Sequence, residues 1–172
     1  MQSSNERHAE WLASMRPELP DPWHRLLEEV IRAGEEVQRV LGTGLSAAAY
    51  EAALRHELGL RGLSVEDRVV AVRYKGVELP AQRLELVVNA LVSVEVRVAA
   101  ELGEVRVEPV MERLRAADLP LGLVINFGVA LLRHGVQRSV NRVARAALGL
   151  FPPIEGSEGD EHGPIQFSGT SA

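Results

Sequence analysis

Residues 83–100, RLELVVNALVSVEVRVAA, decide the fold of this chain. The second half of the stretch has a valine at every second position: Val92, Val94, Val96 and Val98. The positions between the valines are polar or charged: Ser93, Glu95 and Arg97. Such period-two alternation is typical of a strand with one apolar face. We therefore expect a strand whose valine face is buried against helices.

The first half of the stretch alternates as well and predicts the partner strand. One face carries Leu84, Leu86 and Val88, and the other carries Glu85 and Val87. Asn89 and Ala90 lie between the two apolar runs, where a hairpin turn is expected. The hairpin would bring three charged residues onto adjacent strands: Glu85, Glu95 and Arg97.

The spacing of these three charges allows two interpretations. Nucleases that hold Mg²⁺ between two acids, with a lysine beside the scissile phosphate, use a similar spacing. Glu85 and Glu95 would then be metal ligands, although Arg97 is not a lysine. Alternatively, the charges lie on the solvent face of an antiparallel sheet, where opposite charges on neighbouring strands add only about 0.2–1 kcal/mol. Spacing alone leaves both interpretations open.

Composition limits the kinds of site and location. The 172 residues suit one domain with short appendages, and the absence of cysteine excludes disulfides and thiolate zinc sites. The five histidines lack ligand spacing, so any metal must be bound by carboxylates. The N-terminus has no signal-peptide pattern, and the apolar run at residues 119–132 is too short to span a bilayer. We expect a soluble, cytoplasmic protein with no membrane partner.

The charge distribution gives no general attraction to nucleic acid. The net charge is -5, but the last twenty residues hold four acids and no lysine or arginine, which leaves the remainder near -1. Nucleic-acid binding would therefore need a local patch. Residues 136–148 have a helix-like pattern with arginines at i, i+4 and i+7: Arg138, Arg142 and Arg145. This stripe is either a phosphate-contacting surface or a solvated helix face.

The remaining elements predict an α/β fold. Helices are expected at residues 23–41, with Asp21 as the N-cap, and at 46–60, capped by Ser46, and the two would form an antiparallel hairpin. A strand at 65–74 precedes the central hairpin. A helix at 106–117 and a strand buried on both faces at 121–127 follow it. We divide the chain into a polar arm with a short helical piece (1–21), a single domain (22–148) and a disordered acidic tail (149–172).

With these elements in this order, the chain resembles the GxxExxY family, compact relatives of the PD-(D/E)XK nuclease fold. The resemblance covers residues 26–142 and is carried by VQRVLGTGLSAAAYEAAL, RHELGLRGL, YKGVEL and LGLVINFGVALLRHGVQRSVN. It implies a mixed sheet flanked by helices, with an N-terminal helical hairpin. It also implies a site made of Glu85, Glu95, Arg97 and a further glutamate from the first helix, here Glu36, with Mg²⁺ as the cofactor.

Five positions depart from the family pattern. Glu85 replaces an aspartate, Arg97 a lysine, Ala47 the glutamate of the motif, Gln38 a histidine and Pro109 a glutamine. Mg²⁺ tolerates little departure from octahedral geometry, which a longer carboxylate disturbs. An arginine keeps the charge but cannot give up a proton. Together the changes argue for weak or absent phosphodiester hydrolysis.

Three functions follow from these observations. The first is a divergent, catalytically impaired nuclease-like domain with a nucleic-acid-binding or structural role. The second is a working Mg²⁺-dependent DNA phosphodiesterase that uses Glu85, Glu95 and Arg97. The third is a protein-interaction module, for example a homodimer that uses the edge of its sheet or its C-terminal tail. The fold does not choose among them.

Overall fold

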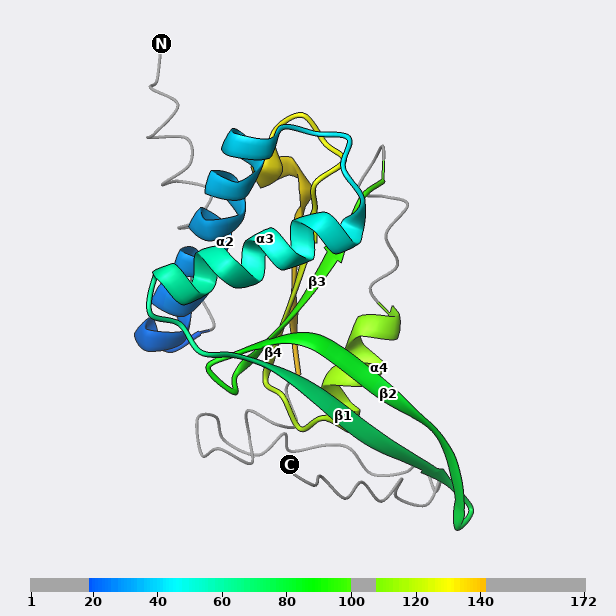
Figure 1. The fold of residues 1–172 in the computed structure, drawn as a ribbon. Coiled ribbons are helices and arrows are strands. Elements are labelled where there is room, and N and C mark those ends of the chain that lie inside the picture. Colours follow the sequence, from blue (N-terminus) through cyan, green and yellow to red (C-terminus); the bar gives the residue numbers. More distant parts are fainter. Residues whose placement is uncertain (1–18, 100–107, 142–172) are drawn as a thin grey trace.

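The computed structural model describes residues 19–99 and 108–141, with every side chain in these ranges except those of Glu85, Glu108 and Pro109. Figure 1 shows helices packed around a twisted sheet. The helices are α2 (Asp21–Leu41), α3 (Ala47–Leu60), α4 (Glu108–Ala116) and the short 3-10 helix η2 (Leu132–Gly135). The strands are β1 (Val65–Tyr74), β2 (Val77–Val88), β3 (Val92–Arg97), β4 (Leu121–Asn126) and β5 (Val136–Val140).

The described strands form one mixed sheet. Its five strands follow the order β1-β2-β3-β4-β5, so β1 and β5 lie at the edges. Only β3 and β4 are parallel, and α4 lies between them in the sequence. Parallel neighbours need such a crossover. The predicted α/β class, with a mixed sheet flanked by helices, is confirmed.

The central hairpin forms where the sequence predicts it. β2 and β3 are antiparallel, and Leu86 pairs with Val94 while Val88 pairs with Val92. Asn89 and Ala90 have φ values of 49° and 55°. Two successive left-handed residues give a tight turn whose twist matches that of the strands.

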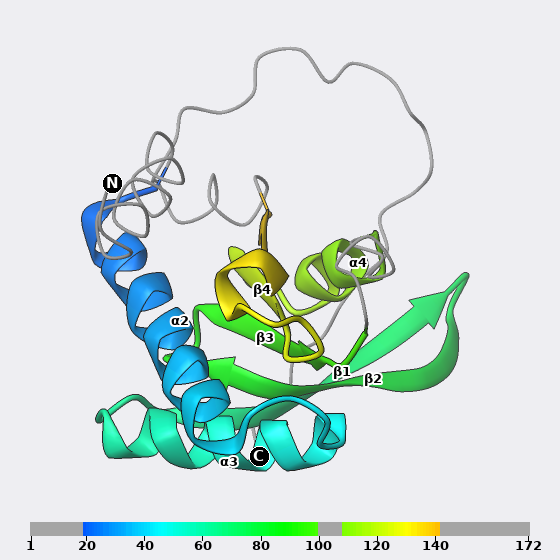
Figure 2. The same cartoon turned by 90° about the horizontal axis from the view of Figure 1, so that it is seen from above.

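Two hydrophobic cores lie on opposite faces of the sheet. Figure 2 shows α2 and α3 on one side of the strands and α4 on the other. Val92, Val94 and Val96 are buried with residues of α2 and α3, as predicted. On the opposite face, Val87 packs with Val110 and the other buried residues of α4. The sheet is therefore covered on both faces near its centre.

This second layer argues against the interpretation that the polar face of β3 meets solvent. Ser93 is only 3% exposed, because α4 covers that face. Val98 was predicted to share the buried valine face, but it lies beyond the end of β3 and is 41% exposed. The alternation was read correctly, but the sequence pattern did not reveal where the strand ends or what covers its second face.

A β-bulge corrects the predicted face of Leu84. The pairs Glu66–Val87 and Arg68–Leu84 leave one residue of β1 opposite two of β2. The two residues of the bulge are Glu85 and Leu86. An extra residue breaks the alternation. As a result, Leu84 packs in the α4 core rather than beside Leu86.

The N-terminal helices begin and end close to the predicted positions. Ser46 caps α3, and its Oγ accepts a hydrogen bond from the Ala49 amide at 3.3 Å. Gly42 ends α2 with φ 69°. Asp21 is the first residue of α2 rather than its cap, which is Pro20. Negative charge in the first turn is favourable in either position.

The relative orientation of α2 and α3 differs from the prediction. Figures 1 and 2 show the two helices crossing, rather than running antiparallel side by side. The loop between them is held by Tyr50, whose hydroxyl donates to the Gly42 carbonyl at 2.7 Å. Both helices bury one stripe against the same sheet face. Packing on a twisted sheet decides the crossing, which helical periodicity does not encode.

The predicted C-terminal helical piece is also corrected. Residues Val136–Val140 form β5, antiparallel to β4, instead of a helix. The backbone hydrogen bonds offered by β4 override the helix-like spacing, and Ser139 is buried opposite Gly122. The rest of that piece (142–148), the short helical piece near the N-terminus and the tail at 149–172 lie outside the described residues.

Candidate functional site

A pocket of about 210 Å³ lies where α3, β2, β3 and α4 meet. Its lining includes five charged residues: Glu51, Arg83, Glu95, Arg97 and Arg113. Three guanidinium groups therefore face two carboxylates, and the described lining has one excess positive charge. Two of the predicted site residues, Glu95 and Arg97, are brought together here.

The Glu95 carboxylate is bound by two arginines. Its Oε1 accepts hydrogen bonds from Nε of Arg113 at 2.7 Å and from Nη2 of the same residue. Its Oε2 accepts from Nη2 of Arg97. The Glu95 side chain is only 11% exposed. Hydrogen bonds between ionised partners are strong when shielded from water, so both oxygens are firmly engaged.

Arg113 comes from α4, and sequence reasoning missed it. The helix can approach the sheet closely because β4 has a glycine at position 122, where a Cβ would lie 2.8 Å from the Leu114 side chain. Arg113 lies one helical turn after Pro109, on the same face of α4. A search for a polar residue one helical turn after Pro109, the glutamine position of the family pattern, could have found Arg113.

Arg97 ends β3 at the mouth of the pocket. Its Nη1 donates to the Val96 carbonyl at 3.0 Å, and nearly half of its side chain is exposed. Asn126 holds the adjoining backbone: it accepts from the amides of Ala99 and Gly128 and donates to the Ala99 carbonyl, at 2.8–3.0 Å. The end of β3 is thus fastened to β4, which keeps Arg97 beside Glu95.

The backbone places Glu85 near Glu95. The hydrogen-bonded register of β2 and β3 reaches Leu86 and Val94, and one further step would set Glu85 opposite Glu95. Glu85 also lies in the β-bulge described above. Bulges are frequent next to active sites, because they re-aim a side chain.

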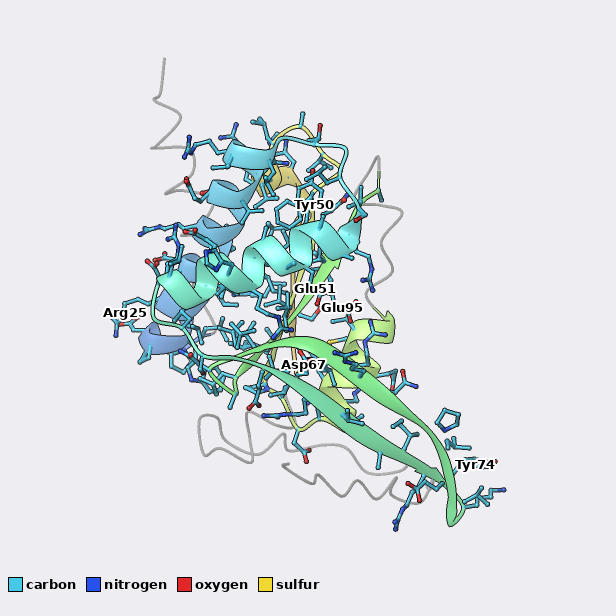
Figure 3. All side chains as sticks on the ribbon, in the orientation of Figure 1. Arg25, Tyr50, Glu51, Asp67, Tyr74 and Glu95 are labelled. Atoms are coloured by element: carbon cyan, nitrogen blue, oxygen red, sulfur yellow. The ribbon has the colours of Figure 1, made fainter. Side chains whose placement is uncertain are left out.

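Glu51 is a second residue that sequence reasoning missed. It lies on α3, one helical turn after Ala47, the position of the motif glutamate. Figure 3 shows Glu51 close to Glu95, and both line the pocket. The Arg55 guanidinium lies 4.0 Å from its carboxylate. A search of the same helix face for an acid one turn away would have found it.

Glu36, the acid assigned to the first helix, is not among the pocket residues. It lies on the surface of α2, where Arg39 donates to its two oxygens at 2.6 and 2.8 Å. These hydrogen bonds lower the pKa of the Glu36 carboxyl, and the charge of Arg39 adds to the effect. The arrangement is an ordinary ion pair within one helix.

Gln38, which stands at the histidine position of the family pattern, has a structural role. Its Nε2 donates to the Val129 carbonyl at 2.8 Å, and its Oε1 accepts from the Leu132 amide at 2.9 Å. Both bonds fasten the loop after β4 to α2. A side-chain amide suits this position, because it donates and accepts at once.

Tyr50, the last residue of the family motif, is also structural. Its ring stacks on Phe127, with centroids 4.4 Å apart, and its hydroxyl accepts from the Leu45 amide besides donating to Gly42. The residue is fully buried. Part of the motif therefore supports the fold and holds the start of α3, which carries Glu51.

The three arginines proposed to bind nucleic acid are not brought together by the described residues. Arg138 lies on β5, half-buried and opposite Leu123. Arg142 and Arg145 lie outside the described ranges. The i, i+4, i+7 relation cannot hold for Arg138, because a strand rather than a helix contains it.

Comparison with known proteins agrees with this arrangement. A family model for the PD-(D/E)XK nuclease superfamily matches residues 24–139. The chain belongs to this superfamily. The match includes all buried core residues except Trp23 and every charged residue of the pocket. Searches of curated proteins and of solved structures gave no match.

Nucleases of this superfamily typically use divalent metals, but the described pocket residues do not fit one. Mg²⁺ needs oxygen ligands, and both oxygens of Glu95 are bound by arginine. Among the described side chains, which do not include that of Glu85, no group of three acidic or histidine residues is placed to hold a metal. Two guanidinium groups beside one carboxylate would also repel a cation.

No helix in the described ranges combines the length and the apolar character needed to cross a membrane.

Proposed function

We propose that this domain is a catalytically impaired member of the PD-(D/E)XK superfamily, close to the GxxExxY proteins, that binds nucleic acid without cleaving it. The observation that carries the proposal is the binding of Glu95 by Arg97 and Arg113. In a working site of this type the acid would be available to a metal. In this structure Glu95 instead accepts hydrogen bonds from two arginine side chains, Arg97 and Arg113.

The two arginines affect hydrolysis in different ways. Arg113 would have to leave Glu95 before a metal could bind there, at the cost of an ion pair that is largely shielded from water. Arg97 stands where the family has lysine. A guanidinium cannot lose its proton near neutral pH, and its planar fork is a poor substitute for an ammonium that orients water.

The same arginines suit a phosphate. Each guanidinium has five N–H donors, and the bonds to Glu95 use only some of them. Arg83 adds a third guanidinium at the rim, although it is also bonded to Asp67 at 2.6 Å. Arginine groups held in place by carboxylates are well ordered for bidentate binding of phosphate oxygens. A backbone phosphate is thus a better ligand for this pocket than a cation.

One observation favours the alternative, a working Mg²⁺-dependent phosphodiesterase. Glu51 lies one turn from the missing motif glutamate and lines the pocket. Together with Glu95 and with Glu85 in the bulge, it could restore an acidic set if Arg113 moved away. In the first proposal Arg113 stays bonded to Glu95 when metal is added, whereas in the alternative Arg113 leaves Glu95 and the metal takes its place.

Metal titration and cleavage assays test the proposal. We expect no saturable heat when Mg²⁺ or Mn²⁺ is titrated into the protein, and no cleavage of plasmid or single-stranded DNA above background. The same protein should bind a short DNA duplex by fluorescence anisotropy. Arg97→Gln combined with Arg113→Gln should weaken that binding at least about tenfold, because the variant lacks two guanidinium groups that bind phosphate.

A restored variant provides the comparison. It combines Glu85→Asp, Arg97→Lys and Ala47→Glu with Arg113→Gln, because groups that act together need not respond to single changes. Gain of metal-dependent cleavage that Glu95→Gln abolishes supports an impaired ancestral site. Robust cleavage by the unaltered protein, lost in Glu95→Gln, would overturn the proposal. Failure of the unaltered protein to bind DNA at low salt would also reject it.

A further inference from the structure

The sheet edge at β1 is open along its whole length in the described part of the chain. β1 ends the strand order, and its only described partner is β2. It has ten residues, whereas about five or six are typical. An unpaired edge of this length can accept another strand, and natural proteins usually block such edges with short strands, charged side chains, prolines or bulges.

β1 lacks the proline and the bulge residues that interrupt the edge of β2. Beyond the Leu86–Val94 pair, β2 leaves β3, and the β1–β2 hairpin continues as the two-stranded arm seen in Figures 1 and 2. The edge of the arm formed by β2 contains Pro80 in a second bulge. β1 has no proline, and the extra residues of both bulges belong to β2. The β1 edge is thus the regular one.

The arm also exposes apolar side chains. Tyr74 and Val77, which pair across the hairpin, are 60% and 61% exposed. Val69 and Leu79 are 58% and 40% exposed. A two-stranded ribbon is only marginally stable in water, so a third strand would stabilise the arm as well as cover part of this surface.

The order of charges along β1 identifies the partner. The first half of the strand carries Glu66, Asp67 and Arg68, which have a net charge of -1, and the second half carries Arg73. Arg68 already donates to the Glu66 carboxylate at 2.7 Å, so Arg73 of a second copy would share this acid with Arg68. If two copies of β1 pair antiparallel about a two-fold axis between Val69 and Val70, Glu66 of each copy lies opposite Arg73 of the other. Arg73 makes no ion pair with another described residue within its own chain. The strand is therefore complementary to itself, as a two-fold interface requires.

We propose that the chain forms a homodimer through antiparallel pairing of its β1 strands, which joins the two sheets into one. This inference does not depend on the nucleic-acid proposal. The pockets at α4 lie on the other side of β2 and remain accessible in the dimer. A dimer would present two such pockets to one nucleic acid.

Charge reversal at the two paired positions tests the proposal. Sedimentation equilibrium of the full chain at micromolar to hundred-micromolar concentration should show a monomer–dimer equilibrium. Glu66→Arg places arginine opposite arginine, and Arg73→Glu places acid opposite acid. Each change should weaken the dimer at least about tenfold, since like charges face each other twice. The double variant restores opposite charges and should dimerise as the unaltered chain does.

Mixing the two single variants gives the decisive measurement. In the mixed dimer both pairs again consist of opposite charges, so the 1:1 mixture should dimerise although neither variant does so alone. Both changes also act within one chain: Arg73→Glu sets an acid opposite Glu78, and Glu66→Arg removes the ion pair with Arg68. Circular dichroism is therefore recorded for each sample. Recovery on mixing cannot arise from a folding defect. A monomer throughout the concentration range, or a dimer that neither charge reversal weakens, would overturn the proposal.

Discussion

Single residues account for the unusual character of the pocket. Two charged residues of the pocket lie one helical turn beyond positions where the GxxExxY pattern has a polar group: Glu51 after Ala47, and Arg113 after Pro109. A shift of four residues keeps a side chain on the same helix face. On our proposal, the pocket keeps its location while its chemistry differs, and Glu95, a candidate metal ligand, is bonded to arginine.

Asn126 is predicted to be the most sensitive polar residue near the pocket. It is fully buried, and its amide makes three hydrogen bonds to backbone groups of Ala99 and Gly128. Asn126→Ala leaves these groups without their partner and should lower the free energy of unfolding by about 2–4 kcal/mol. Urea denaturation measures the loss. The matched control Gln82→Ala, on an exposed part of β2, should change stability by less than about 0.5 kcal/mol. Equal effects would contradict the role assigned to Asn126.

Among the elements, β3 connects the fold to the site. One face of this strand fills the core under α2 and α3, and the other carries Glu95 toward α4. One step beyond the Leu86–Val94 pair, the register of β2 and β3 would set Glu85 opposite Glu95. The strand therefore has no solvent face over most of its length, and polar substitutions should be tolerated only at its C-terminal end.

Substitutions along the valine row of β3 test this assignment. Val94→Asp buries an unpaired carboxylate and should cost several kcal/mol, about 3 or more, whereas Val98→Asp, at an exposed position past the strand, should cost less than about 0.5 kcal/mol. Ser93→Asp should also destabilise, because α4 covers Ser93. Thermal melting of the three variants distinguishes these cases. Loss of stability in Val98→Asp but not in Val94→Asp would mean that the buried part of the strand is assigned wrongly.

At the scale of the whole molecule, charge is local rather than global. The net charge of -5 opposes binding to nucleic acid, so binding must come from clusters of arginine. The pocket is one such cluster, with Arg83, Arg97 and Arg113. The set Arg138, Arg142 and Arg145 stays a prediction, with only Arg138 in the described residues.

The salt dependence of DNA binding separates these contributions. Replacing Arg138, Arg142 and Arg145 with glutamine should reduce the slope of log affinity against log salt by roughly 0.9 for each phosphate that these arginines neutralise on duplex DNA. A control that removes Arg25, Arg32 and Arg39 from α2 changes net charge equally. If the control lowers the slope as much, the effect comes from net charge alone. If neither variant changes the slope, Arg138, Arg142 and Arg145 form a solvated surface that does not contact phosphate.

The local sequence was sufficient for most elements of this fold. Alternation identified the β2–β3 hairpin, Asn89 and Ala90 its turn, and Ser46 and Gly42 the helix ends. These features depend on neighbours within a few residues. Periodicity, capping and turn chemistry act over that range, so they can be read from the chain alone.

Tertiary structure decided what lies over each face and which charges meet. The helix-like spacing of residues 136–140 yielded to strand pairing with β4, and the face of Ser93 and Glu95 is buried because α4 crosses above it. Arg113 reaches Glu95 from 18 positions further along the chain. Neither propensity nor spacing encodes such an ion pair, since it arises from the packing of a helix on a sheet. That packing turned a candidate metal ligand into the acceptor of two arginines.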